Sequence, residues 1–330
     1  MKTINYLIFI VISFCSLVSG CKKGNNTTST TPVVVVLPDT IPPGWNKIKV
    51  DATGNAISDI FFINNSLGYA CFQTGGIFKS INGGTTWTKV SDAAGENIAV
   101  TSDGKAFFVN NSNSVTKTLD GGVTFIPQLL VSPSLNDVFF SDNLTGIVSS
   151  RSQIFVTTDG STSWNLSGTF PYPDNGYASA FMYDNTHAWV VYENRVLHAA
   201  GNLNTATWQT DTVISQVPNM ALITVWATSP TTVFTCSYSG FLYKSTNGGA
   251  SFTFLQKLNS GAVNSFSDLH FIDSNTGYIS VGSRLYKTTD AGNTWQMILA
   301  LGNTGIIEIH FTDASHGWAC CGDGTILKLN

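Results

Sequence analysis

The sequence is poor in charge. Only 11% of its residues are Asp, Glu, Lys or Arg, whereas ordinary globular domains carry about 25%. The net charge of −4 leaves no basic surface that would neutralise a phosphate backbone, so we expect no nucleic-acid partner. The polar surface must therefore come mainly from Ser, Thr, Asn and Gly.

Helical patterning and the common catalytic motifs are also missing. Nowhere do apolar residues recur at helical spacing over a dozen positions, which argues against an α-helical domain. The sequence has no Gly-rich phosphate loop, no zinc-ligand spacing and no Ser/His/Asp order of a hydrolase. We therefore expect no metal, no cofactor and no catalytic residue.

What the sequence does contain is an eight-residue pattern that recurs. It occurs as "SINGGTTW" (80–87), "TLDGGVTF" (118–125), "TTDGSTSW" (157–164), "STNGGASF" (245–252) and "TTDAGNTW" (288–295), with a longer, degraded copy at 199–208. The final aromatic residues recur every 38–44 residues, and Trp45 lies one further step upstream. A period in this range indicates a repeat architecture.

Each repeat contains four short runs typical of β-strands. In the copy that ends near residue 300 the runs are "FSDLHFID", "TGYISVG", "RLYKTTD" and "TWQMILA", rich in β-branched and aromatic residues and bounded by turn formers. Four antiparallel strands about every 42 residues describe one propeller blade. The predicted fold is all-β, a seven-bladed β-propeller over residues 44–330.

The two ends of the repeat region complement each other. The C-terminal unit supplies three strands, "IIEIHFTD", "HGWACCG" and "GTILKLN", and lacks the outer one. The segment "GWNKIKV" (44–50) has the pattern of that missing strand. We therefore predict that the N-terminal strand completes the last blade, which leaves no unpaired strand edge at the closure.

One polar position recurs in the eight-residue pattern, whose turn is called the box turn below, and it has a structural explanation. Asp or Asn in a hairpin accepts bonds from nearby backbone amides, and Gly supplies the positive φ that the turn needs. Every blade needs this turn, whereas a catalytic Asp is needed once. The residues expected to be structural are Asn82, Asp120, Asp159, Asn247 and Asp290, with the buried rings of Trp87, Trp164 and Trp295.

These residues carry a family resemblance. The pattern Ser/Thr-x-Asp-x-Gly-x-Thr-Trp resembles the Asp-box, or BNR repeat, of sialidases, sortilin-type receptors and some glycoside hydrolases. The fuller unit, as in "IHFTDASHGWACCGDGTILK" (309–328), is similar to repeats of photosystem II stability/assembly factor-like proteins, and the likeness covers residues 44–330. The resemblance implies a non-catalytic binding or assembly scaffold with its ligand on the face opposite the box turns.

The alternative function is a glycan-binding or sialidase-like glycoside-hydrolase propeller. A sialidase needs three arginines, a Tyr nucleophile and a Glu partner, and this chain offers three arginines and the pair Tyr192 and Glu193. The Arg-Ile-Pro signature of sialidases is absent near the first blade. We therefore expect no enzyme activity.

The N-terminal residues predict a location. Residues 1–20 have Lys2 and a short apolar run that is typical of a signal peptide. "VSGC" resembles a bacterial lipobox, which implies cleavage before Cys21 and lipid on its sulfur; the alternative is an ordinary cleaved signal. Residues 21–43 are polar and Pro-bounded, as in a flexible tether. We expect a monomer in the bacterial cell envelope, anchored by lipid and holding an envelope or membrane protein. Lys22 favours the outer membrane.

The face opposite the box turns carries the predicted ligand site. All three arginines, Arg151, Arg195 and Arg284, map to turns between second and third strands, and their planar side chains suit carboxylate or phosphate. The expected ligand-binding residues beside them are Phe170, Tyr172, Tyr177, Tyr192, Glu193 and Tyr238. The partner would be a protein or an anionic ligand. The alternatives are solvated hairpin arginines and a rigid loop that contacts nothing.

Several further residues recur at one repeat position. Acids occur at the entry to the innermost strand, where they indicate either a hydrated channel mouth or a cation site, and two histidines follow two residues later, where packing between blades is expected. Lysines of the third strands indicate blade surfaces. Cysteines of the second strands are expected as buried thiols, with a disulfide between Cys71 and Cys320 as the alternative. These residues are Asp59, Asp137, Asp268, Glu308, His270, His310, Lys79, Lys117, Lys244, Lys287, Lys328, Cys71, Cys236, Cys320 and Cys321.

Overall fold

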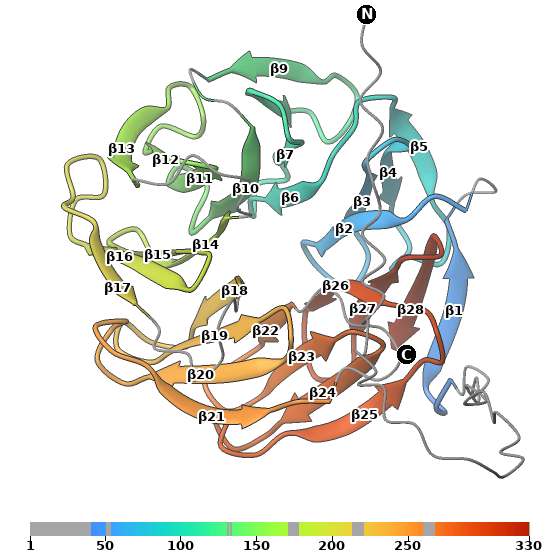
Figure 1. Cartoon of the computed structure of the whole chain (residues 1–330). Coiled ribbons are helices and arrows are strands. Elements are labelled where there is room, and N and C mark those ends of the chain that lie inside the picture. Colours follow the sequence, from blue (N-terminus) through green and yellow to red (C-terminus); the bar gives the residue numbers. More distant parts are fainter. Residues whose placement is uncertain are drawn as a thin grey trace, which may run out of the picture. The chain divides into compact units, whose positions relative to one another are not determined.

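A computed structural model of the chain shows a ring of β-sheets (Figure 1). The chain divides into two compact units, Met1–Val35 and Val36–Asn330. The structure describes residues 41–50, 54–130, 132, 134–170, 178–212, 221–259 and 268–329, all in the second unit. The signal peptide, Cys21 and most of the tether lie outside the described residues. None of the described residues forms a helix long and apolar enough to cross a membrane.

The described strands form seven sheets of four antiparallel strands each, called blades one to seven in chain order. The innermost strands are β2 (Ile57–Phe62), β6 (Asn97–Val100), β10 (Leu135–Phe140), β14 (Ala178–Asp184), β18 (Leu222–Ala227), β22 (Leu269–Phe271) and β26 (Ile306–Phe311). The second strands are β3 (Gly68–Phe72), β7 (Ala106–Val109), β11 (Gly146–Ser150), β15 (His187–Tyr192), β19 (Val233–Ser237), β23 (Gly277–Val281) and β27 (Gly317–Cys321).

The remaining strands complete the blades outwards. The third strands are β4 (Gly76–Ser80), β8 (Ser114–Thr118), β12 (Gln153–Thr157), β16 (Arg195–Ala200), β20 (Phe241–Ser245), β24 (Arg284–Thr288) and β28 (Thr325–Leu329). The outer strands are β5 (Thr88–Ser91), β9 (Ile126–Leu129), β13 (Asn165–Thr169), β17 (Gln209–Thr212), β21 (Thr253–Lys257), β25 (Gln296–Ala300) and β1 (Trp45–Lys49).

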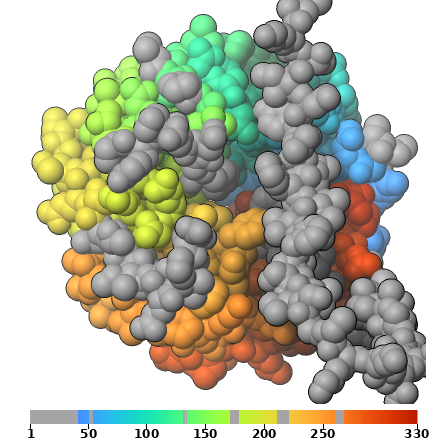
Figure 2. All heavy atoms as spheres, in the orientation of Figure 1, coloured from blue at the N-terminus to red at the C-terminus, as the bar shows by residue number. Residues whose placement is uncertain are grey.

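The N-terminal strand closes the ring, as predicted. Blade seven has the order β1-β28-β27-β26, and β1 pairs with β28 from Trp45 opposite Leu329 to Lys49 opposite Thr325. Trp45 is buried, and its ring meets the edge of Phe311 at 6.4 Å. In the space-filling view, the blue atoms of the N-terminal strand lie against the red atoms of the last blade (Figure 2).

Aromatic stacking joins one blade to the next. A phenylalanine at the end of an innermost strand stacks on an aromatic side chain in the second strand of the preceding blade, with ring centroids 3.6–4.8 Å apart. The stacked pairs are Phe62 on Trp318, Phe140 on Phe107, Phe271 on Phe234 and Phe311 on Tyr278. Such pairs stabilise the fold by more than the burial of their apolar area alone would. Because they join one blade to the next, much of the core lies between the sheets.

The antiparallel strands sort the turns onto two faces. Turns between first and second strands lie at the same end of a blade as the box turns; in blade one, the Gly83 N–H donates to the Ser66 carbonyl at 2.8 Å. Turns between second and third strands, and the connections between blades, therefore lie at the opposite end. We call these ends the box face and the loop face.

The box turns are held by their polar side chain. In blade six, Asp290 accepts bonds from the Thr294 N–H at 2.8 Å, the Thr294 hydroxyl at 2.6 Å and the Thr288 hydroxyl at 2.8 Å. Trp295 donates its Nε1–H to the Gly292 carbonyl at 3.2 Å. The equivalent polar contacts are made by Asn82, Asp120, Asp159 and Asn247, and equivalent ring positions are taken by Trp87 and Trp164.

The lysines of the third strands correct one interpretation of the sequence, which placed them on blade surfaces. Lys79 donates to the Gly121 carbonyl at 2.5 Å, and Lys244 donates to the Ala291 carbonyl at 3.0 Å. Each acceptor belongs to the box turn of the following blade. Lys117 and Lys328 make equivalent contacts with Ser161 and Thr85, so these four lysines connect adjacent blades, whereas Lys287 lies over the Tyr278 ring of its own blade.

Candidate functional site in the central channel

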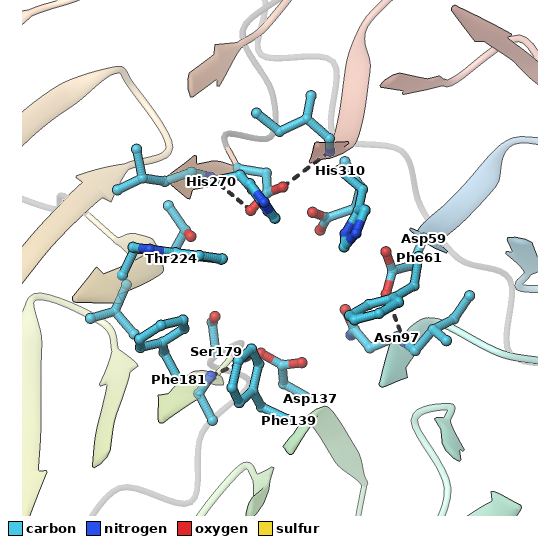
Figure 3. A pocket seen from close by; sticks show the side chains of 18 of the residues that line it. Asp59, Phe61, Asn97, Asp137, Phe139, Ser179, Phe181, Thr224, His270 and His310 are labelled. Carbon is cyan, nitrogen blue, oxygen red and sulfur yellow. Dashed lines mark hydrogen bonds between the residues drawn. The ribbon is translucent and has the colours of Figure 1, made fainter. Parts of the chain in front are cut away.

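The innermost strands surround a cavity of about 200 Å³ on the axis of the ring. Each blade lines it with one side chain from the same register position, and Figure 3 labels five of these side chains around the cavity. These seven side chains, called the polar ring, are Asp59, Asn97, Asp137, Ser179, Thr224, Asp268 and Glu308. Because each innermost strand runs from the loop face to the box face, the polar ring lies toward the loop face.

The carboxylates of the polar ring connect neighbouring blades. Asp59 accepts the Ile98 N–H of blade two at 2.6 Å, and Asp137 accepts the Ala180 N–H of blade four at 2.8 Å. Asp268 makes the same contact with blade seven at 3.0 Å. Each of these aspartates also accepts the N–H of the residue that follows it. The acids are therefore fixed in direction before any ligand arrives.

Burial makes these carboxyls hard to ionise. Each keeps some access to the channel, but the surrounding blades remove most of the water that would solvate a charge, and this desolvation raises the pKa of Asp59 to about 8 and that of Asp137 to about 7. Desolvation and the nearby Asp268 carboxylate raise the pKa of Glu308 well above its usual value. Asp268 and Glu308 share a side-chain hydrogen bond. Near neutral pH the ring therefore carries protons.

A belt of aromatic rings lies two residues further along the same strands. Successive ring centroids are 4.4–4.9 Å apart around the channel. The belt runs through Phe61, His310, His270, Trp226, Phe181 and Phe139. Blade two has Ala99 at the equivalent position. The belt therefore narrows the box-face end of the channel and is interrupted at one blade.

The two histidines of the belt are neutral. Desolvation lowers the pKa of His310 to about 4, and desolvation with the neighbouring His310 lowers that of His270 well below its usual value. His310 Nε2 lies 2.9 Å from the Phe62 carbonyl, a contact that fixes this nitrogen as the donor. Packing between blades, as the sequence predicted, is their observed environment. No three His, Cys, Asp or Glu side chains among the described residues converge as metal ligands.

The three arginines lie at turns on the loop face. Arg195 and Arg284 begin β16 and β24, Arg151 lies between β11 and β12, and all three are half-buried. Arg151 and Arg195 belong to adjacent blades, whereas Arg284 is two blades further on. Two of the three therefore lie on neighbouring blades, and the third lies apart from them.

The aromatic residues predicted beside the arginines are not all exposed. Phe170 and Tyr192 are only 5% and 2% exposed, and their rings stack with centroids 4.6 Å apart in the core between blades three and four. Both were expected as ligand-binding residues, but the stack covers both rings and leaves little of either for a ligand to contact. Tyr238 is 41% exposed, and Glu193 occupies its turn with a φ of 50°. Tyr172 and Tyr177 lie outside the described residues.

The four described cysteines are buried thiols. Cys71 packs in the cluster between blades one and two, whereas Cys320 packs between blades seven and one, where its Sγ lies 3.6 Å from the Ile57 carbonyl. Burial raises the pKa of both thiols. Cys71 and Cys320 therefore contact different neighbours and are not paired in this structure.

A second cavity marks the degraded box turn of blade four. It has a volume of about 400 Å³ and is lined by small and polar residues between His198 and Gln209. Trp208 does not bond its own turn and instead donates to the Ser167 hydroxyl of blade three at 2.9 Å. The two extra residues of this turn thus displace the aromatic ring and leave a hollow on the box face.

Comparison with known proteins gives the fold but no close relative. No protein-family profile matches the chain, and no curated protein matches it. The structure of YCF48 bound to a D1 peptide is similar with a TM-score of 0.69 and 18% identity, covering 88% of this chain and 98% of that chain. The repeat resemblance to photosystem II assembly-factor-like propellers is therefore confirmed at the level of the fold.

Two enzymes share the same architecture. Virginiamycin B lyase from Staphylococcus aureus has a TM-score of 0.71 at 11% identity, covering 86% of this chain and 98% of that chain. The GH74 xyloglucanase from Xanthomonas campestris has a TM-score of 0.67 at 12% identity, covering 87% of this chain and 54% of that chain. The fold is thus compatible with both binding and catalysis, and function has to be argued from the site.

Proposed function

We propose that this protein is a non-catalytic scaffold of the bacterial cell envelope that holds a protein segment on the loop face of its propeller. The observation that supports it most is the likeness of the whole ring to YCF48, a propeller whose structure contains a bound D1 peptide. Likeness at this identity concerns the fold, so the partner of this chain follows from its own residues.

The loop face has the chemistry of a peptide-binding surface. Half-buried Arg151 and Arg195 stand on adjacent blades, and neither Arg151 nor Arg284 forms an ion pair with any residue that the structure describes. Arginine and exposed tyrosine, here Tyr238, are enriched at interaction hot spots. A partner segment that carries a carboxylate fits the arginines, and the channel mouth lies on the same face.

Capture from envelopes tests this function. Crosslinked envelopes from cells that produce the tagged full chain should yield a stoichiometric envelope protein. The triple change Arg151→Ala, Arg195→Ala and Arg284→Ala should reduce its recovery roughly tenfold. A matched control is Lys49→Ala, Lys89→Ala and Lys257→Ala, which removes the same charge from outer strands β1, β5 and β21. An equal loss of partner recovery in the arginine and lysine triple variants would contradict the proposal.

The lipid anchor is part of the same proposal. It rests on the signal-like residues 1–20 and on the "VSGC" sequence that ends at Cys21. Lipid on Cys21 would hold the propeller at a membrane, for which the outer membrane is favoured. Radiolabelled palmitate should enter the wild-type chain and not Cys21→Ala, and that variant should appear in the soluble fraction. Equal labelling of both chains would exclude the anchor.

The second candidate function is glycoside processing, and the similarity to the GH74 xyloglucanase over 87% of this chain is the observation that favours it. Release of a fluorophore from a β-glucoside or sialoside, abolished in Arg195→Ala, would establish that function. If no fluorophore is released at high protein concentration and the partner is captured, the scaffold function is supported.

A further inference from the structure

We propose that the central channel is a socket for one lysine-type ammonium side chain of the bound partner, inserted from the loop face. This inference rests on the proposed function and names the chemical group that the partner presents. It assigns the polar ring and the aromatic belt to recognition as well as to the packing of blades.

The size of the cavity limits its occupant. A volume of about 200 Å³ is smaller than the pockets of about 300–1,000 Å³ that hold drug-sized ligands. A folded segment or a disaccharide would not enter. One long, thin side chain fits, provided that the main chain of the partner stays on the loop face.

The lining selects a cation, and two independent features support this. Carboxyls alone would indicate only hydration. Here they lie at one end of a partly open cavity whose other end is the belt of six rings, and the faces of Phe and Trp rings attract ammonium groups that have lost their water. An apolar side chain would pack against the belt, but it would displace water from the polar ring without replacing the hydrogen bonds of that water.

The spread of the acids favours an organic cation over a metal ion. Asp59, Asp137 and Asp268 stand on blades one, three and six and do not converge on one point among the described residues. A metal ion needs several ligands within about 2.6 Å. An ammonium group instead needs only one carboxylate partner, because its other N–H donors can bond neighbouring hydroxyls or water in the channel.

Protonation couples to this binding. The pKa of Asp137 is about 7 and that of Asp59 is about 8, so an entering ammonium displaces protons at neutral pH. The other ionisable groups that face the cavity are Asp268, Glu308, His270 and His310. Both histidines are neutral at this pH because their pKa values are lowered, so they do not repel the cation. Binding should therefore weaken as the pH falls from 8 to 5.5, because the carboxyls then stay protonated.

A matched pair of probes tests the socket with the full chain. The probes are N-acetyl-lysine methylamide and the isosteric N-acetyl-norleucine methylamide, titrated by calorimetry at pH 7.5 in phosphate and in Tris. We expect the lysine probe to bind at least tenfold more tightly, with heats that differ between buffers because protons are released. Equal affinity of the two probes, or no binding by the lysine probe, would overturn the proposal.

Variants locate the binding in the channel. Asp137→Asn should weaken the lysine probe roughly tenfold, and Asp273→Asn, which changes an exposed acid of the box face, should not. If Asp137→Asn does not fold, the contrast between the two probes on the wild-type chain still decides. If the lysine probe fails while envelope capture depends on the arginines, the socket is wrong and the scaffold stands. If the lysine probe binds but envelope capture does not depend on the arginines, the proposed scaffold function is wrong and the channel remains a site for an ammonium group.

Discussion

Trp318 of blade seven lies flat against Phe62 of blade one, with ring centroids 3.6 Å apart and planes 7° from parallel. Both side chains are almost fully buried. The Trp318 Nε1–H also donates to the Gly83 carbonyl in the box turn of blade one at 3.0 Å. This contact joins the last blade to the first, so the closure is held by side chains as well as by the pairing of β1 with β28.

Truncation of this contact should be costly. Trp318→Ala removes a buried ring and leaves a cavity at the closure, so the free energy of unfolding should fall by about 3–5 kcal/mol. Urea unfolding followed by tryptophan fluorescence and circular dichroism measures this. Leu144→Ala, at a position that is 53% exposed, should change stability by less than about 0.5 kcal/mol. Similar midpoints for the two variants would show that the stack does not stabilise the ring.

Lys244→Met tests the lysine contacts between blades. The substitution keeps the apolar length of the side chain but removes the bond to the Ala291 carbonyl and the charge 5.1 Å from the Phe234 ring. We expect a loss of about 1 kcal/mol in the free energy of unfolding. Lys49→Met, at an exposed position of β1, is the control. If both changes have the same small effect, the lysine is a surface residue as the sequence first indicated.

Asp290→Ala should destabilise the box turn in a pH-dependent way. Bonds from the Thr294 hydroxyl and N–H lower the pKa of Asp290 from 3.8 to about 2. A lowered pKa stabilises the fold above the unfolded value near 4, and this contribution disappears as the pH falls through 2. The melting temperature of Asp290→Ala should therefore lie several degrees below that of the wild type at pH 6 and approach it near pH 2.

Asp290→Asn is the matched control for that change, since Asn82 and Asn247 make the equivalent contacts in blades one and five. It should keep most of the melting temperature at pH 6. A loss as large as that of the alanine variant would mean that the charge, rather than the hydrogen bonds, holds the turn.

Because of the polar ring, we predict that the free energy of unfolding falls as the pH rises. The pKa values of Asp59 and Asp137 are raised from 3.8 to about 8 and about 7, so the folded state holds protons that the unfolded state has lost. This contribution is complete below pH 4 and is lost as the pH rises through 7 and 8. The lowered pKa of His310 acts oppositely, but only below 6.5.

The measurement is the urea midpoint between pH 6.5 and 9, where the histidines are neutral in both states. It should fall from pH 6.5 to about 8 in the wild type, level off as both aspartates ionise in the folded state, and fall less in Asp137→Asn. Asp273→Asn should keep the wild-type slope, because the pKa of Asp273 is lowered and this acid is ionised throughout the range. A flat profile in the wild type would mean that water in the channel solvates the carboxyls.

The number of blades and the closing strand could be predicted because both depend on local sequence. A box turn and an aromatic residue mark each hairpin, and the spacing from Trp45 to Trp295 sets the count. The pairing of β1 with β28 follows from two incomplete repeats at the ends of the region. None of this requires knowledge of how the side chains pack.

The site was harder to predict because its properties arise only when the seven blades close into a ring. The sequence placed Asp59, Asp137, Asp268 and Glu308 around the channel, but their lost ionisation depends on how far the blades exclude water. The aromatic belt was missed because Phe61 and Trp226 look like ordinary strand residues in a single repeat. Aligning the repeats on the acids would have revealed an aromatic residue or histidine two positions later in six of the seven blades.

Residues at the arginine turns show a different limit. Phe170 lies in a connection between blades and looked exposed for that reason. Its contact with Tyr192 of the next blade covers it. Such contacts depend on the path of the connection, which repeat periodicity does not specify.

The pairing of β1 with β28 also sets an order of events during synthesis. Strand β1 leaves the ribosome before the other described strands and has no partner until residues 325–329 have emerged. Contacts this distant in sequence form slowly. Strand β1 must therefore remain unpaired while the other six sheets assemble. A chain that stops before residue 325 would expose an unpaired strand edge on both β1 and β27.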